Sequence, residues 1–105
     1  MKFIFEIKLK PGFTANDYRA AWEKGSAIIQ KELGAQGTKL HQKMDDPNTL
    51  LAIASWESKE LRDQAMERLE KMPEEIREIL KAHEAIADFN WLGHFEEIAE
   101  VKPVL

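Results

Sequence analysis

The sequence predicts an α+β fold of the ferredoxin-like, split βαβ type, in which helices cover one face of a four-stranded antiparallel sheet. Three observations support this prediction. Strand-like alternation occupies residues 3–9 and 87–96, a hairpin pattern occupies residues 37–56, and helical spacing follows both the first strand and the hairpin. With 105 residues and neither a linker nor an internal repeat, the chain predicts one domain over residues 1–105.

The first strand is expected over residues 3–9, where side chains of the two faces follow period 2. Pro11-Gly12 ends it, because proline cannot donate a hydrogen bond to a neighbouring strand. Residues 14–33 predict a helix that begins after Thr14 as N-cap and ends at Gly34.

A hairpin is expected next, with strands at residues 37–44 and 50–56 and a turn over the turn-forming residues 45–49. Its second strand is almost entirely apolar, which is typical of a strand buried on both faces. We therefore expect this strand at the centre of the sheet.

Two helices are expected after the hairpin. Ser58 is the predicted N-cap of the first, and Pro73 the opening residue of the second, where its missing N–H costs nothing. Helical spacing then places His83 on the apolar face of this last helix, beside Ile79 and Leu80.

The last strand is expected over residues 87–96, where period 2 returns. Strict alternation would project Asp88, Asn90 and His94 together from one side of it. Residues 98–105 are expected either to continue this strand or to form an arm.

Helices on one face of the sheet leave the other face, which carries Ile4, without a cover. Bare sheet faces of this size normally find a partner. A homodimer that stacks two such faces into an α+β barrel is the expected solution for so short a chain.

The composition excludes several classes of protein. Fifteen Lys and Arg face 19 Asp and Glu, a net charge of −4 that argues against nucleic-acid and anionic-membrane partners. The absence of Cys excludes thiol catalysis, iron–sulfur clusters and Cys-ligated zinc. The N-terminus does not resemble a signal peptide and no apolar run reaches the about 20 residues of a membrane span, so a cytoplasmic protein is expected. Phosphate-binding and nucleophile motifs are also missing, which argues against hydrolases, kinases and nucleotide-dependent enzymes.

The candidate catalytic residues are histidines on strands, His41 and His94. An ordinary histidine pKa near 6.5 suits a general base, and a polar triplet of Asp88, Asn90 and His94 would be one way to build a site. The alternative is an edge strand with its polar side in water. No metal site is expected, because the spacing of the three histidines matches no metal-binding motif.

Aromatic side chains suggest a pocket for a flat apolar ligand. Tyr18 and Trp22 lie one helical turn apart, and Gly25 beside them leaves space on the same helix face. A core filled by the same rings is the alternative. The aromatic candidates are Phe3, Phe5, Tyr18, Trp22, Phe89 and Trp91.

Taken in order, four segments of the chain resemble the antibiotic biosynthesis monooxygenase domain of the dimeric α+β barrel superfamily, over roughly residues 1–70. The most specific is the turn followed by a strand that ends in Trp-Glu-Ser. The segments are Lys10-Pro11-Gly12 after the first strand, Phe13 to Trp22, Gly34 to Leu40, and Asp46-Pro47-Asn48 leading to Ala54-Ser55-Trp56-Glu57-Ser58.

This resemblance implies a homodimer with a small pocket between sheet and helices in each subunit. It also implies oxidation of a small aromatic or quinol-like compound by O₂ without a bound cofactor. The alternative is a non-catalytic protein of the same fold, which binds a small molecule or functions through its dimerisation.

Haem binding or degradation is a second alternative, because some relatives degrade haem. Those relatives use an Asn on the first strand, where Ile7 stands here, and His83 could take the place of their His. No Trp precedes His83 on the later helices. The full set of predicted pocket residues is Phe5, Ile7, Tyr18, Trp22, His83, Asn90 and Trp91.

Overall fold

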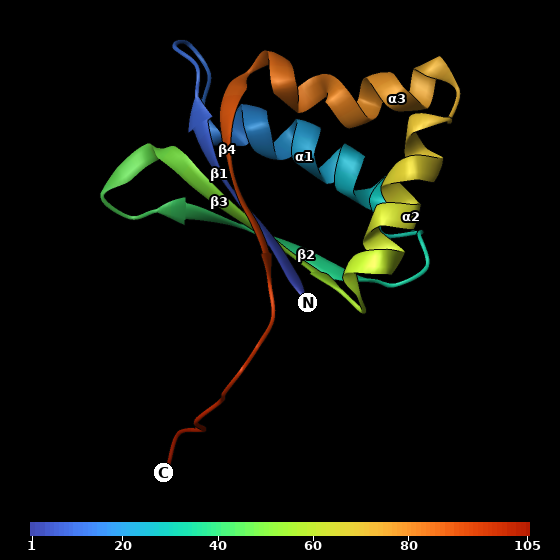
Figure 1. Ribbon diagram of the computed structural model, residues 1–105. Coiled ribbons are helices and arrows are strands. Elements are labelled where there is room, and N and C mark those ends of the chain that lie inside the picture. Colours follow the sequence, from blue (N-terminus) through green and yellow to red (C-terminus); the bar gives the residue numbers. More distant parts are fainter.

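The computed structural model describes residues 1–105 and confirms the predicted α+β, ferredoxin-like fold. One antiparallel sheet has the strand order β2-β3-β1-β4, and the helices lie on one of its faces (Figure 1). As predicted, the apolar strand β3 is internal. The elements are β1 (Lys2–Leu9), α1 (Ala15–Ile29), β2 (Ala35–Lys43), β3 (Asp46–Trp56), α2 (Lys59–Glu70), α3 (Glu74–Lys81), the 3₁₀ turn η1 (Ala82–Ala85) and β4 (Ala87–Phe95).

The predicted helix starts are confirmed by their caps. The Thr14 hydroxyl accepts from the backbone N–H of Asp17, and the Asp17 carboxylate accepts from the N–H of Thr14, which completes a capping box. The Ser58 hydroxyl accepts from the N–H of Leu61 at the start of α2. Pro73 is the N-cap of α3, one position before the first helical residue.

Helix α1 ends at Ile29, so the predicted end near Gly34 is wrong. The N–H groups of Lys31 and Glu32 donate to carbonyls three residues back, as in a 3₁₀ turn. This tighter turn ends the α-helix. Gly34 has a φ of +91°, and a Cβ there would come within 2.8 Å of the Leu61 side chain. Gly34 therefore packs closely against Leu61 of α2, in a backbone conformation that favours glycine.

The hairpin turn is shorter than predicted, because β3 already begins at Asp46. The Asp46 carboxylate accepts from the N–H of Asn48 and from the hydroxyl of Thr49. The Gln42 amide of β2 donates to the carbonyl of Pro47. These bonds stabilise an irregular start of β3, where the register with β2 shifts, and only Met44 and Asp45 remain in the turn.

A β-bulge in β4 overturns the strict alternation predicted for this strand. Phe5 pairs with Trp91 but Ile4 pairs with Gly93, so Leu92 is an extra residue, and Gly93 has a φ of +108°. The extra residue reverses the sheet face to which each later side chain of β4 belongs. His94 therefore lies opposite Phe3, with ring centroids 5.1 Å apart, and is separated from Asp88 and Asn90.

Two expectations for the C-terminal half need correction. Helix α3 ends at Lys81, so His83 lies in η1 and not on the helix itself. The strand alternative for residues 98–105 is wrong, because β4 ends at Phe95 and the tail extends away from the body without regular structure (Figure 1). No helix has the length and apolar character needed to cross a membrane.

The core lies between the sheet and the helices and is small. Only ten of the 105 residues are buried, among them Ile7, Tyr18 and Ala52 in one cluster and Trp56 at the end of β3. The opposite sheet face has no helix over it (Figure 1).

Candidate functional site

A cavity of about 490 Å³ lies between the sheet and helices α1, α2 and α3. A volume of this size suits a ligand of a few fused rings. The sheet contributes Phe3, Phe5, Thr38, Ala54, Trp56 and Trp91 to its lining, and the helical side contributes Tyr18, Trp22, Gly25, Ser26, Ile29, Gln30, Arg62, Met66, Leu69, Glu70, Arg77, Leu80, Lys81, His83 and Glu84.

Aromatic rings of β1 and β4 form one wall. The centroid of Trp91 lies 4.9 Å from that of Phe5 and 5.8 Å from that of Phe3, the latter pair being stacked. Phe89 stacks on Trp91 at 5.4 Å. Trp91 is nevertheless 57% exposed, so the wall presents a broad ring surface beside the cavity.

Tyr18 of α1 is fully buried, and its hydroxyl has no hydrogen-bond partner. Burial raises the pKa of this phenol, so the group stays protonated and able to donate. Buried hydroxyls are almost always paired, so this unpaired one, in a residue that borders the cavity, would gain a partner from a ligand oxygen that reached it.

His83 is half-buried in η1 next to Tyr18. Its ring centroid lies 6.0 Å from that of Tyr18 and 4.9 Å from that of Phe89, edge-on in both cases. Burial lowers the pKa of His83, and the smaller effects of Glu84 and the Leu80 backbone oppose that shift. The imidazole is therefore neutral at pH 7 and able to accept a proton.

Arg62 of α2 is a site residue that the sequence interpretation missed. Its Cζ lies 3.6 Å from the centroid of Phe3, and its Nη1 lies 3.4 Å from Nε2 of His94. Burial lowers the pKa of the guanidinium, and Asp63 opposes that shift. The available signal was its spacing, because Arg62 shares a helical face with Met66 and Leu69.

The structure brings five of the predicted pocket residues together around the cavity: Phe5, Tyr18, Trp22, His83 and Trp91. The other two lie elsewhere. Ile7 is fully buried in the core, and Asn90 is exposed and pairs with Glu6, whose side of β1 faces away from the helices.

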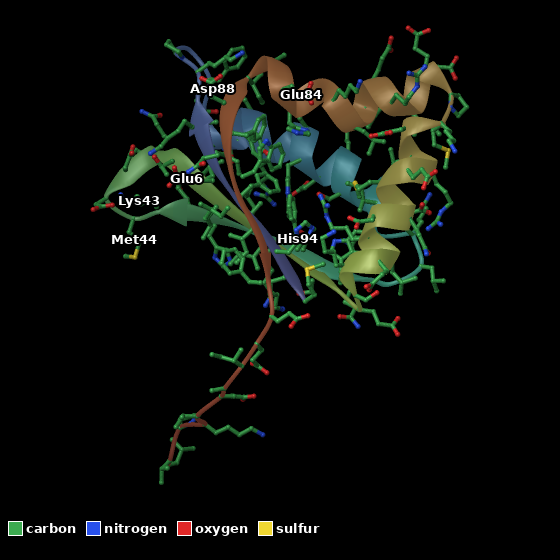
Figure 2. The ribbon with its side chains drawn as sticks, in the orientation of Figure 1. Glu6, Lys43, Met44, Glu84, Asp88 and His94 are labelled. Carbon is green, nitrogen blue, oxygen red and sulfur yellow. The ribbon has the colours of Figure 1, made fainter.

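Neither of the two predicted catalytic histidines lines the cavity. His41 is exposed and pairs with Leu51, on the sheet face opposite the helices. His94 lies between the end of β4 and α2 (Figure 2), beside Arg62. Burial, Arg62 and Lys59 lower the pKa of His94, and Asp63 opposes them.

The cavity contains no arrangement suited to a metal ion. No group of three or more His, Asp or Glu side chains converges anywhere in the structure. The chemistry that the lining offers is therefore an aromatic wall, a phenol donor, a neutral imidazole and a guanidinium.

Residues 1–84 match the family described as antibiotic biosynthesis monooxygenase. No curated protein is significantly similar in sequence.

Several solved structures share the fold. SnoaB, a cofactor-independent oxygenase from Streptomyces nogalater, is 13% identical with a TM-score of 0.69, over 94% of this chain and 96% of its own. A protein from Bordetella bronchiseptica, provisionally described as an antibiotic biosynthesis monooxygenase, is 17% identical with a TM-score of 0.68, over 93% and 96%. PA3566 from Pseudomonas aeruginosa is 22% identical with a TM-score of 0.60, over 90% and 93%.

Proposed function

The chain belongs to the antibiotic biosynthesis monooxygenase family, and from this premise we propose that it oxidises a small aromatic or quinol-like compound with O₂ and without a bound cofactor. The observation that carries the proposal is the aromatic cavity of about 490 Å³, whose lining includes the half-buried His83 and Tyr18, the residue with an unpaired buried hydroxyl. The fold shared with SnoaB, a cofactor-independent oxygenase, is consistent with it.

In this proposal the substrate supplies all the electrons. A quinol and O₂ give a hydroxyquinone and water, so one oxygen atom enters the product and the other leaves as water. His83 accepts a phenolic proton, because the phenolate that results is a far better electron donor toward O₂. Trp22 and Trp91 hold the ring system in place, and the hydroxyl of Tyr18 donates to a substrate oxygen.

His83 is favoured as the base because it is the histidine that lines the cavity. A role for His94 remains a prediction, with its place beside Arg62 as support. A role for His41 also remains a prediction, and it would require a ligand or a second copy on the opposite face of the sheet.

The test is oxygen uptake by the purified protein with a panel of naphthohydroquinones, each corrected for its autoxidation in buffer. We expect uptake that scales with protein concentration and falls strongly in His83→Gln. Uptake no faster than autoxidation across the panel would favour the alternative, a non-catalytic small-molecule-binding protein of the same fold.

We also propose that the protein is a homodimer joined through the bare sheet face. The single chain buries few residues, and this face carries the apolar side chains Ile4, Leu51 and Ile53 between polar ones. The tail adds exposed apolar residues, with Ile98 98% and Val101 95% exposed. Light scattering tests the proposal, and a mass of about one chain in solution would contradict it.

Haem binding remains the second alternative. Ile7, at the position of the Asn found in haem-degrading relatives, is fully buried and offers no polar atom to the cavity. We expect hemin titration to give no endpoint at one per chain, and a sharp endpoint would revive this alternative.

A further inference from the structure

Arg62 is a cation without a counter-ion. The ion pairs of the chain involve other residues, and the neighbouring Asp63 is bound to Lys59 at 2.7 Å. Its polar neighbour is a ring nitrogen of His94, and its flat face covers the ring of Phe3. A half-buried guanidinium in this state has lost part of its hydration and still has donors to offer an anion.

Tyr18 provides a second, independent polar group. It is fully buried, and its hydroxyl is the one buried side-chain polar atom in the structure that lacks a partner. The same residue lines the cavity. A ligand oxygen there would satisfy a donor that is otherwise unpaired.

A row of aromatic rings connects these two groups. Arg62 lies on Phe3, Phe3 lies 5.9 Å from Phe5, Phe5 lies 5.9 Å from Phe89, and Phe89 lies 6.2 Å from Tyr18. Arg62 and Tyr18 are thus separated by a series of rings, of which Phe3 and Phe5 line the cavity. This arrangement suits a flat molecule with an oxygen at each end.

The charge of the lining is opposite to that of the chain. Three cationic side chains, Arg62, Arg77 and Lys81, line the cavity against two carboxylates, Glu70 and Glu84, in a chain of net charge −4. Arg77 also makes no ion pair and donates to the carbonyl of Met72. The local excess of positive charge attracts an anion and disfavours a cation.

Building on the proposed function, we infer that the ligand is an aromatic acid, whose carboxylate binds Arg62 while an oxygen at its far end accepts from Tyr18. A carboxylate accepts two parallel hydrogen bonds from a guanidinium, which a neutral amide cannot match. Arg62 thus selects for an anionic substrate, and Tyr18 fixes the depth at which the substrate lies beside His83.

The test is calorimetric titration of the full chain with 6-hydroxy-2-naphthoic acid and, as its neutral counterpart, 6-hydroxy-2-naphthamide. We expect the acid to bind about tenfold to a hundredfold more tightly than the amide, the range of a hydrogen bond to a charged group. Arg62→Gln should remove the difference. Arg19→Gln, which changes the same charge on the exposed side of α1, should preserve it.

A third ligand tests the contribution of the Tyr18 hydroxyl separately from that of Arg62. Tyr18→Phe should weaken binding of 6-hydroxy-2-naphthoic acid, whereas 2-naphthoic acid, which lacks the distal oxygen, should bind the variant and the native protein equally.

The outcomes separate this inference from the proposed function. Equal affinity for acid and amide in the native protein, which requires no variant to fold, would overturn the anion inference and leave the aromatic cavity in place. Equal losses in Arg62→Gln and Arg19→Gln would also overturn it, because the effect would then come from net charge. If none of the naphthalenes binds, both the inference and the ligand-binding role of the cavity are wrong.

Discussion

The two faces of the sheet differ in what covers them and in the side chains they carry. The face under the helices carries the rings of Phe3, Phe5 and Trp91 and encloses a cavity. The opposite face alternates apolar residues such as Ile53 with polar ones such as Lys2 and Glu6, and no helix lies over it. We therefore propose that the covered face binds the ligand and that the bare face pairs two chains.

Substitution of His83, on the covered face, should have the largest effect on activity. His83→Gln keeps a polar side chain but removes the base, so kcat/KM for a hydroquinone should fall by about 10² to 10⁴. Lys39→Gln, at an exposed position on the bare face, is the control and should stay within about twofold. Similar losses in both variants would show that the division between the faces is wrong.

Ile53 tests the bare face. Ile53→Asp should weaken dimerisation by about 3–5 kcal/mol, because an unpaired carboxylate would be buried between two sheets. Met44→Asp is the control, since Met44 lies at the exposed hairpin tip, away from the helices and the sheet face (Figure 2). Sedimentation equilibrium measures both, and a dimer that tolerates Ile53→Asp would place the interface elsewhere.

Removal of the Tyr18 hydroxyl should have a smaller effect, and it should stabilise the protein instead of destabilising it. Tyr18→Phe removes a buried donor that has no partner, so the free energy of unfolding should rise by about 1 kcal/mol. Urea unfolding of the ligand-free protein measures it. A decrease beyond about 1 kcal/mol would mean that the hydroxyl is hydrogen-bonded within the protein and that the depth of the substrate is set by another residue.

The pH dependence of stability should give the smallest effect. Burial lowers the pKa of His83 in the folded protein, so the unfolded chain takes up a proton first as the pH falls below about 6.5. The free energy of unfolding should therefore decrease from pH 7.5 to pH 5.5, and less steeply in His83→Gln than in the native protein. Identical slopes would show that the environment of His83 is as polar in the folded as in the unfolded chain.

The fold could be predicted because each element carries a local signal. Alternation identified β1 and β4, turn-forming residues identified the hairpin of β2 and β3, and the side chains of Thr14 and Ser58 identified two helix starts. The early end of α1 and the short hairpin turn escaped prediction, since they depend on contacts between distant segments, such as Gly34 with Leu61.

The candidate site was only partly predictable. Aromatic residues at strand and helix spacing indicated several of the rings that line the cavity, among them Phe5, Trp22 and Trp91. The bulge at Gly93 was not predictable from one glycine in a strand, and it decided which face His94 joins. Arg62 was overlooked because charge on a helix usually means a solvated face, whereas here the guanidinium lies on Phe3.

Isotope labelling shows whether the protein oxidises its substrate with O₂ and without a cofactor. The purified protein is incubated with a naphthohydroquinone carboxylic acid under ¹⁸O₂, in the presence of a metal chelator, and the product is analysed by mass spectrometry. We expect one ¹⁸O atom in each hydroxyquinone formed, at a rate that depends on His83. Product that acquires its oxygen from water, or that forms no faster than without protein, would contradict it.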